Sequence, residues 1–367
     1  MTKPSFERTR AIFENGIQEK LHPGAQLYVS RAGEVLIDEA FGEAREGVPM
    51  RSDSITLWFS AGKPITAVAI GQLVERGLLQ WDTRVAEVVP EFVGQGKEPV
   101  TLRHLLTHTA GLRNAEAIDS SLSWDEQIAR ICELPLEENW IPGQRAGYHV
   151  SGTWQLLGEI VRRAGGLPVD AFVRENIFLP LEMNDSWLSL PAQNLGSYGE
   201  RLAFVYDTSS SPAHPRQEWN SDDGFTRCRP GGNVRGPVRE LGRFYEALLR
   251  GGEEILKPEI VRAMISRQRT GMFDETFQFK MDWGFGFILN SNRDGFQMPY
   301  SYGRHASPDA FGHSGNQSSC AFADPRQQLV VAWACNGQPG ERKHQQRQRA
   351  INNAIYEDLG IEAPAQA

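Results

Sequence analysis

The sequence predicts an α/β (α+β) protein, in which both ends of the chain build one body and a helical segment is inserted between them. Strand-like patterns occur near the start of the chain and again after residue 280, while helical patterns separated by Pro- and Gly-rich loops fill residues 80–231. We therefore expect an α/β domain made of residues 1–79 and 232–367, and a mostly helical domain made of residues 80–231.

In the first half of the chain, residues 5–20 have the spacing of an amphipathic helix. Residues 25–31 and 34–41 have the pattern of two strands, and Ala32-Gly33 between them predicts a hairpin turn. Residues 60–77 are apolar on most sides, which predicts a long buried helix. The helical patterns of the middle segment lie at 101–112, 124–134, 151–165 and 168–181.

The second half begins with a helix at 236–250, which Gly251-Gly252 ends. The period then changes from helical to strand-like. Strands are predicted at 283–289, 318–324 and 329–335, and the last two are joined by a turn at Pro325-Arg326. A helix at 343–358 closes the chain.

Composition is typical of a water-soluble globular protein, since the 367 residues are 40% hydrophobic and 23% charged. The net charge of −8 and the lack of a basic run argue against nucleic acid as a partner. The four cysteines form no C-x-x-C pair and are expected to be reduced thiols. Neither a secretory signal nor an apolar run of about 18 residues is visible, so we expect a cytoplasmic protein without a membrane span. No pattern predicts an oligomeric state.

The segment 57-LWFSAGKPITAVAIGQLVERGLL-79 places one of only seven lysines in an otherwise apolar helix. Ser60 and Lys63 are three residues apart and would share one helix face. A serine there becomes a nucleophile if a neighbouring group takes its proton, and Lys63 is a candidate for that group. The pKa of this lysine would have to fall by about 3 units, which costs about 4 kcal/mol and is within reach of burial.

This pair alone is a weak signal, since 23 serines and seven lysines produce roughly 0.4 S-x-x-K matches by chance. In the structural alternative, Ser60 caps the helix and Lys63 extends its amine to water. Four other segments stand beside the pair: 99-PVTLRHLLTHTAGL, 142-PGQRAGYHVSGTWQLLGEIV, 230-PGGNVRGPVRELGRFYEALLRGG and 311-FGHSGNQSSCAFADP.

Taken together, these segments resemble the serine β-lactamase-like superfamily, in particular the branch of class C β-lactamases and family VIII carboxylesterases. The S-x-x-K pair comes first in the chain. The segment that holds the family's catalytic tyrosine follows, with Tyr148 at that position, and the strand that carries the family's K-T-G-type triplet begins its triplet at His313. Five matches in the family's order extend from about residue 20 to residue 340, which is nearly the whole chain.

The resemblance implies an antiparallel sheet flanked by helices, a mostly helical domain, and an active site in the cleft between them. It also implies a serine carboxylesterase that needs no metal or cofactor. In that chemistry Ser60 attacks a carbonyl carbon, while Lys63 and Tyr148 move its proton and later activate the deacylating water. The backbone N–H groups of Ser60 and Asn316 would form the oxyanion hole. Because Lys63 is the one fixed cation in the three catalytic motifs, we expect Lys63 and Tyr148 to share a single proton.

Two positions depart from the β-lactamase pattern. The tyrosine motif Y-x-N is Y-H-V here, and a valine cannot bind an amide as asparagine does. The triplet K-T-G is H-S-G here, and a histidine is mostly neutral near pH 7. Both changes favour a neutral, more apolar ester, so the expected partner is a small-molecule ester of short to medium chain length. The residues expected to contact it are His313, Ser314, Gly315, Val150 and His149.

Several alternatives stay open. An amidase or D-amino-acid peptidase, an acyltransferase or a weak β-lactamase could use the same residues, and a non-catalytic binding protein is a further possibility. An α/β-hydrolase is excluded because no G-x-S-x-G pentapeptide occurs. His104 and His108 have zinc spacing, but a third ligand is not evident, so no metal is predicted. Candidates for the walls of an acyl pocket, with core packing as the alternative, are Trp58, Trp140, Trp154, Tyr206 and Phe311.

Overall fold

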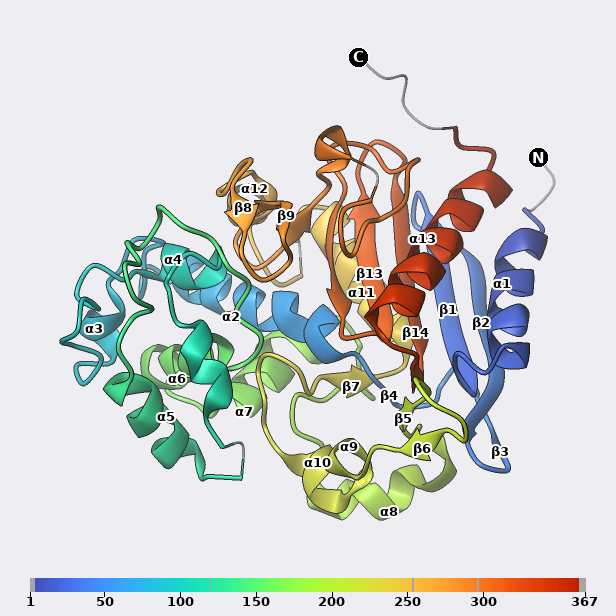
Figure 1. The fold of residues 1–367 in the computed structure, drawn as a ribbon, viewed down its shortest axis with the longest axis horizontal. Coiled ribbons are helices and arrows are strands. Elements are labelled where there is room, and N and C mark those ends of the chain that lie inside the picture. Colours follow the sequence, from blue (N-terminus) through green and yellow to red (C-terminus); the bar gives the residue numbers. More distant parts are fainter. Residues whose placement is uncertain (1–3, 120, 253, 296, 363–367) are drawn as a thin grey trace.

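The computed structural model describes residues 4–119, 121–252, 254–295 and 297–362. Within these ranges the largest sheet has eight antiparallel strands in the order β10-β11-β12-β13-β14-β1-β2-β3 (Figure 1). As the sequence predicts, these strands come from the two ends of the chain. They are β1 (Gly24–Arg31), β2 (Glu34–Arg45), β3 (Val48–Pro49), β10 (Asp282–Trp283), β11 (Ile288–Leu289), β12 (Phe311–Gly315), β13 (Ser319–Asp324) and β14 (Leu329–Cys335).

The hairpin predicted near the start of the chain is confirmed. Its turn residues Ala32 and Gly33 have φ values of 51° and 81°, the left-handed conformation that a tight two-residue turn requires. On its other side β1 pairs with β14, and Ala25 lies opposite Cys335. This pairing places the first strand of the chain beside the last strand of the large sheet, so the two ends of the chain form one body.

Helices cover both faces of the sheet (Figure 1). α1 (Glu7–Gln18) packs against α13 (Glu341–Asp358), and α11 (Val238–Leu249) packs against β1, β13 and β14. The strands alternate accordingly, because Leu27 of β1 belongs to the hydrophobic cluster of α1 and α13, whereas Tyr28 belongs to the cluster that contains α11. The sheet is therefore the middle layer of three.

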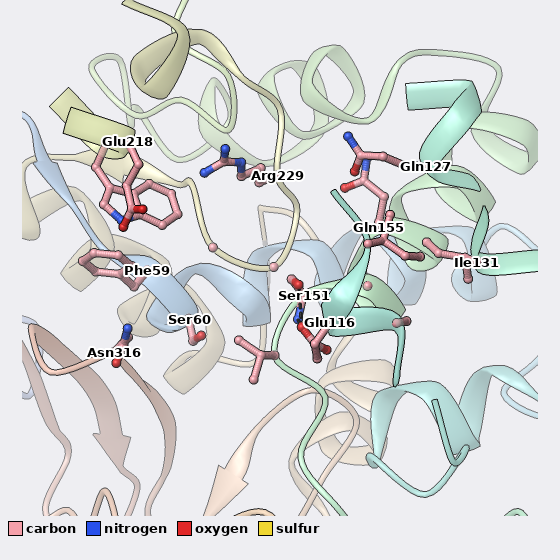
Figure 2. A pocket seen from close by; sticks show the side chains of 17 residues that line it. Phe59, Ser60, Glu116, Gln127, Ile131, Ser151, Gln155, Glu218, Arg229 and Asn316 are labelled. Atoms are coloured by element: carbon pink, nitrogen blue, oxygen red, sulfur yellow. Dashed lines mark hydrogen bonds between the residues drawn. The ribbon is translucent and has the colours of Figure 1, made fainter. Parts of the chain in front are cut away.

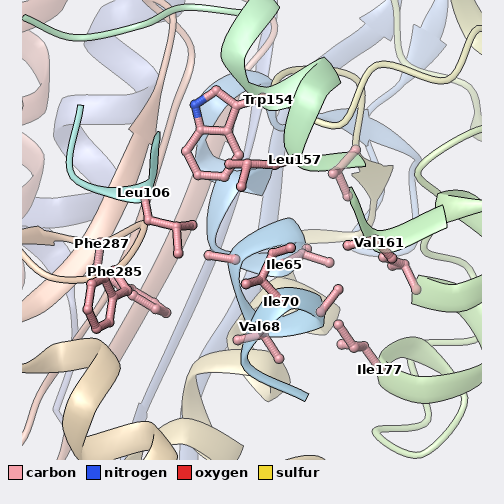
Figure 3. Packing of buried hydrophobic residues seen from close by; sticks show 14 of the residues in the cluster. Ile65, Val68, Ile70, Leu106, Trp154, Leu157, Val161, Ile177, Phe285 and Phe287 are labelled. Carbon is pink, nitrogen blue, oxygen red and sulfur yellow. The ribbon is translucent and has the colours of Figure 1, made fainter. Parts of the chain in front are cut away.

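The buried helix predicted at 60–77 is confirmed, but its start differs. A 3₁₀ turn, η1 (Phe59–Gly62), leads directly into α2 (Lys63–Glu75). Every residue of α2 as far as Leu73 is buried, and the helix packs against α6 (Gly152–Gly165). Figure 3 shows apolar side chains of α2 enclosed by α6 on one side and by aromatic residues that precede β11 on the other. This burial on all sides explains why the helix has no polar face.

One predicted strand is wrong. Residues 283–289 form the ends of two short paired strands, β10 and β11, with a turn between them. Gly286 has a φ of 81°, and its N–H donates to the Leu106 carbonyl oxygen at 3.0 Å. Phe285 and Phe287 are buried in the cluster around α2. Their need for burial explains the alternating apolar residues that suggested a single strand. The chain reverses here because the glycine allows a turn that periodicity does not show.

Helices are the predominant regular structure in the middle of the chain, as predicted. The pattern at 101–112 contains only a short helix, and the pattern at 168–181 is a short helix followed by a π turn, η3 (Arg174–Phe178). The helices not yet given are α3 (Val85–Val88), α4 (Leu102–Leu106), α5 (Trp124–Glu133), α7 (Val169–Val173), α8 (Leu195–Tyr198), α9 (Gln217–Asn220), α10 (Asp222–Thr226) and α12 (Pro258–Ile265).

The pairing of β5 with β15 connects the middle segment to the rest of the chain. In addition, β5 pairs with β6, β4 pairs with β7, and β8 pairs with β9. The division of the chain into domains at 79/80 and 231/232 stays a prediction. Across the described ranges, the search for a helix of sufficient length and apolarity to cross a membrane finds none. The bounds of these strands are β4 (Thr56–Leu57), β5 (Tyr206–Asp207), β6 (His214–Pro215), β7 (Arg235–Gly236), β8 (Phe273–Asp274), β9 (Phe279–Lys280) and β15 (Gly337–Gln338).

Candidate active site

Ser60 lies in the 3₁₀ turn before α2, where β12 passes very close to the backbone. A Cβ atom on Gly315 would lie 2.2 Å from the Trp58 carbonyl oxygen and 2.2 Å from Ser319 Oγ, so no side chain fits there. Ser319 Oγ donates to the same Trp58 oxygen at 2.6 Å. Phe59 has a φ of 49°, a strained conformation for a residue other than glycine. The glycine of the H-S-G triplet thus lets β12 support the turn that carries Ser60.

Lys63 is fully buried at the start of α2, and its amine contacts three oxygen atoms. Nζ lies 2.9 Å from Ser60 Oγ, and it donates to the Val150 carbonyl oxygen at 2.6 Å and to the Gly231 carbonyl oxygen at 2.5 Å. The amine also lies 5.3 Å from the centre of the Tyr148 ring. Segments far apart in the sequence therefore hold the amine beside the serine, and the alternative in which Lys63 reaches water is wrong.

Tyr148 completes the group. Its hydroxyl hydrogen-bonds to Ser60, and its ring is packed between His108 and Phe277, at centroid distances of 4.7 and 4.8 Å. Its backbone is held as well, because the Tyr148 N–H donates to Asp274 Oδ1 at 3.1 Å. The Ser60 hydroxyl thus has the amine as one partner and the phenol as another, so the structure brings together the three residues that the sequence singled out.

Two cavities open onto Ser60. The first, which we call the α6 cavity, has a volume of about 350 Å³ and is lined among others by Phe59, Ser60, Gln155 and Trp219. Figure 2 shows Ser60 and Asn316 at one side of it, and Gln127 and Gln155 at the other. The second, which we call the Tyr148 cavity, has a volume of about 260 Å³. Its lining includes Ser60, Tyr148, Thr276, Phe277, Tyr300 and His313.

Known proteins are similar to this chain in sequence and in fold. Residues 9–355 match the Beta-lactamase family. The chain belongs to this family. It is 37% identical over 321 residues to Esterase EstB of Burkholderia gladioli, which covers 77% of this chain and 78% of that protein.

Solved structures show the same likeness. A penicillin-binding protein homologue from Caulobacter crescentus has a TM-score of 0.79 and 29% identity, covering 96% of this chain and 97% of that one. A family VIII carboxylesterase has a TM-score of 0.81 and 27% identity, covering 97% of this chain and 98% of that one. The chain is thus a serine hydrolase with the β-lactamase fold, as its motifs implied.

Burial sets the protonation of the two proton-transfer candidates in this β-lactamase family member. It lowers the pKa of Lys63 to about 7, although Glu116 acts in the opposite direction. Burial raises the pKa of Tyr148 well above that of a free phenol, with the Ser60 hydrogen bond acting against the rise. The amine is therefore the better proton acceptor, and the phenol keeps its proton near neutral pH. These directions favour Lys63 as the base over an evenly shared proton.

A neutral amine fits the contacts of Lys63 closely. An uncharged –NH₂ group has two N–H donors and one lone pair. The carbonyl oxygens of Val150 and Gly231 can only accept, so they take the two N–H bonds. The lone pair then faces Ser60 Oγ at 2.9 Å, in position to accept the hydroxyl proton.

Two residues that line both cavities, Ser60 and Asn316, have backbone N–H groups without a protein partner in the described part of the chain. Among the hydrogen bonds of the described residues, neither the Ser60 N–H nor the Asn316 N–H has a protein acceptor. Both residues line both cavities. Asn316 follows β12, and its carbonyl oxygen accepts from Gln338 Nε2 at 3.0 Å, which holds the turn in place. This arrangement is compatible with the oxyanion hole expected from the resemblance.

The predicted substrate contacts divide into two groups. Val150 lines both cavities, and His313 and Ser314 line the Tyr148 cavity. Gly315 lines neither cavity and instead packs against the backbone of the turn that carries Ser60. His149 lines neither cavity, because its side chain points into the protein. Its Nε2 accepts from the Leu112 N–H at 3.1 Å, and its Nδ1 lies 3.3 Å from His108 Nδ1. We therefore propose no substrate contact for the His149 side chain.

The structure also places the zinc-spaced histidines. His104 Nδ1 accepts from the Thr101 N–H at 3.1 Å and thereby caps α4, whereas His108 is buried against His149. The hydrogen bonds of both histidines thus stabilise the local structure. Over the residues that the structure describes, no group of three or more His, Cys, Asp or Glu side chains is arranged to hold a metal ion.

Several cavity residues were missed by sequence reasoning. Phe59, Trp219, Phe277 and Tyr300 supply the aromatic walls, and they come from four separate segments without a shared motif. Only Phe59 had a signal, as the neighbour of Ser60. None of the five aromatic residues that the sequence suggested lines either cavity. Trp58, Trp140, Trp154 and Phe311 are buried, and Tyr206 lies in β5.

Proposed function

We propose that this chain is a carboxylesterase that cleaves short- to medium-chain esters through an acyl-enzyme intermediate on Ser60. The observation that carries the proposal is the contact set of Lys63. Its amine is buried, hydrogen-bonds to Ser60 Oγ at 2.9 Å, and donates to two backbone carbonyl oxygens. A surface lysine would neither lose its proton at pH 7 nor aim a lone pair at a serine.

The acylation step uses each of these groups once. Ser60 Oγ bonds to the ester carbonyl carbon while its proton passes to Lys63 Nζ, and the carbonyl oxygen becomes an oxyanion. The N–H groups of Ser60 and Asn316 stabilise that charge, and losing one such donor typically costs about 3–4 kcal/mol. The C–O bond then breaks, and the alcohol leaves with a proton delivered from Lys63 by way of the Tyr148 hydroxyl. In deacylation a water molecule takes the place of the alcohol and gives up a proton by way of Tyr148 to Lys63. The bond to Ser60 Oγ then breaks, Ser60 takes the proton back from Lys63, and the acid is released.

The positions of the phenol and the cavities assign the two halves of the ester. The leaving oxygen must lie near a proton donor, and Tyr148 lines only the second cavity. The alcohol part would therefore occupy the Tyr148 cavity, and the acyl part the α6 cavity. The α6 cavity has room for a short to medium acyl chain, at about 350 Å³.

Three features support an ester rather than a β-lactam as substrate. Val150 stands where the β-lactamase pattern has an amide-binding asparagine, and His313 stands where that pattern has a lysine. Burial lowers the pKa of His313 to about 3, so this position offers no cation to a substrate carboxylate. The relative with 37% identity, EstB, is named an esterase.

The proposal is tested by labelling and by turnover. A fluorophosphonate should add to the intact protein with a mass shift of one label, and Ser60→Ala should abolish it because the nucleophile is gone. Wild-type protein should hydrolyse p-nitrophenyl butyrate with a higher kcat/KM than nitrocefin. Ser221→Ala, which removes a serine outside both cavities, serves as the matched control and should still be labelled.

Two outcomes would count against the proposal. Labelling that persists in Ser60→Ala would show that another residue is the nucleophile. A kcat/KM for nitrocefin above that for p-nitrophenyl butyrate would favour a β-lactamase. Adding a competing alcohol or amine to the ester assay separates hydrolysis from acyl transfer, because an acyltransferase forms the new ester or amide in preference to the free acid.

A further inference from the structure

His313 lines the Tyr148 cavity and carries a hydrogen-bond acceptor that the proposed chemistry does not use. His313 Nδ1 lies 2.8 Å from the carbonyl oxygen of Ser314. A carbonyl oxygen can only accept, so Nδ1 carries the hydrogen of the imidazole. In the neutral ring Nε2 is then a lone-pair acceptor. This contact therefore assigns the tautomer of the residue that replaces the family's lysine.

His313 Nε2 is buried and has no hydrogen-bond partner among the described residues. Only 1% of the His313 surface is exposed. Tyr148 and Trp283 pack against the ring at centroid distances of 6.0 and 5.6 Å without a hydrogen bond to it. A buried acceptor without a donor is unfavourable, so a ligand that supplies the donor gains binding free energy.

Two other polar side chains of this cavity, those of Thr276 and Ser314, already have partners. Thr276 Oγ1 donates to the Tyr148 carbonyl oxygen at 3.0 Å, and Ser314 Oγ accepts from Gln348 Nε2 at 3.0 Å. Among the described residues that line the cavity, none has a formally charged side chain. The cavity thus presents an unmatched acceptor in neutral surroundings, which suits a neutral donor and disfavours a carboxylate.

We propose that His313 Nε2 accepts a hydrogen bond from a hydroxyl group on the alcohol part of the substrate, so that this enzyme prefers esters of hydroxyl-bearing alcohols over plain alkyl esters. The inference rests on the proposed function, because that function places the alcohol part in the Tyr148 cavity. It reverses the polarity of this position, since a lysine offers a charged donor and His313 offers an acceptor. The low pKa of His313, about 3, keeps the acceptor available throughout the neutral range.

The test compares esters that differ by one group of similar size. 2-Hydroxyethyl butanoate is paired with propyl butanoate, and 3-hydroxypropyl butanoate with butyl butanoate, and kcat/KM is measured for each. The quantity of interest is the ratio of the hydroxyl ester to the plain ester. In at least one pair, the wild-type enzyme should cleave the hydroxyl ester with a higher kcat/KM than the plain ester. His313→Leu should lower the ratio of these two kcat/KM values about three- to tenfold, the usual range for one hydrogen bond.

Two variants serve as controls. His313→Gln retains an acceptor on a side chain of similar reach and should keep most of the ratio. His104→Leu removes a histidine that lines neither cavity and should leave the ratio unchanged. If His313→Leu does not fold, inhibition of the wild-type enzyme by ethane-1,2-diol and by propan-1-ol decides instead, and the diol should inhibit at the lower concentration.

The inference is overturned if the ratio is the same in wild type and His313→Leu, or if the diol inhibits no better than propan-1-ol. An ester with a carboxylate on its alcohol part, such as butanoyl glycolate, should be the poorest substrate, and a preference for it would also refute the inference. Failure of the proposed function looks different, because then neither the hydroxyl esters nor the plain esters are cleaved.

Discussion

Lys63 is the residue on which the chemistry depends most. An ordinary lysine has a pKa of about 10.4, so only about one molecule in 10³ holds a neutral amine at pH 7. Burial of Nζ lowers the pKa to about 7, which makes about half of the amines neutral at that pH. The neighbouring imidazoles add no charge beside Nζ, because burial lowers the pKa values of His149 and His313 to about 3. Desolvation thus converts a cation into a base.

The pH dependence of turnover should follow this pKa. Protonated Lys63 cannot accept the Ser60 proton, and the protonated fraction grows as the pH falls. We therefore expect kcat/KM to fall about tenfold per pH unit below pH 7 and to level off above it. His149 and His313 should add no step between pH 5 and 9. The measurement is kcat/KM for p-nitrophenyl butyrate across that range. Lys63→Arg, a permanent cation, should lose activity about 10²- to 10⁴-fold at every pH. A flat wild-type profile would contradict a lysine base.

At the scale of elements, the β8–β9 hairpin holds Tyr148 against Ser60. Asp274 is fully buried, and its Oδ1 accepts the N–H of Tyr148 at 3.1 Å while its Oδ2 accepts from Arg269 Nη2 at 2.9 Å. Thr276 Oγ1 donates to the Tyr148 carbonyl oxygen at 3.0 Å. Phe277 packs on the phenol ring. The hairpin therefore binds both backbone groups of Tyr148 and one face of its ring.

Loosening this hairpin should reduce turnover more than substrate binding. Thr276→Val removes one hydrogen bond to Tyr148 and should lower kcat several-fold with little change in KM, at a stability cost of about 1 kcal/mol. Thr276→Ser keeps the hydroxyl and should retain most of the activity. Asp274→Asn leaves the Arg269 cation buried without its partner and should cost about 3–5 kcal/mol in urea unfolding. An unchanged kcat in Thr276→Val would show that the hairpin does not position the phenol.

On the scale of the whole molecule, α2 links the sheet body and the helical middle segment through one core. The hydrophobic cluster around it contains Val68 of α2, Leu157 of α6, Phe244 of α11 and Val330 of β14. The predicted domain boundaries separate α6 from the other three elements, yet all four share this continuous buried surface. Ser60 lies in the 3₁₀ turn that leads into α2, so the site depends on both parts remaining packed against each other.

Unfolding should therefore be a single cooperative transition. Far-UV circular dichroism, tryptophan fluorescence and loss of esterase activity should have the same urea midpoint, because neither part can expose its side of the core alone. Leu157→Ala, in the shared core, should lower all three midpoints together by about 2–5 kcal/mol of stability. Two separate transitions, one of them retaining helical signal, would indicate that residues 80–231 unfold as an independent domain.

The accuracy of the sequence predictions varied with the range of the interactions involved. Local patterns located the β1–β2 hairpin and α2 within a few residues, because turn geometry and apolar periodicity are written in neighbouring residues. The failure at 283–289 arose because Phe285 and Phe287 are buried by contacts with the core around α2, which mimic the alternation of a strand. His149 was expected at the substrate, but its hydrogen bonds to His108 and Leu112 turn it inward.

The sequence by itself determined the fold class, the order of the motifs and the placement of Ser60 and Lys63 on one helical turn, since each depends on spacing along the chain. Only the tertiary structure decided that the phenol of Tyr148 reaches the same hydroxyl and that the amine loses its water. Those features require contacts between segments up to 168 residues apart, such as Lys63 with the Gly231 carbonyl. Burial then shifts the proton affinities, and burial is a property of the packed molecule rather than of any local stretch.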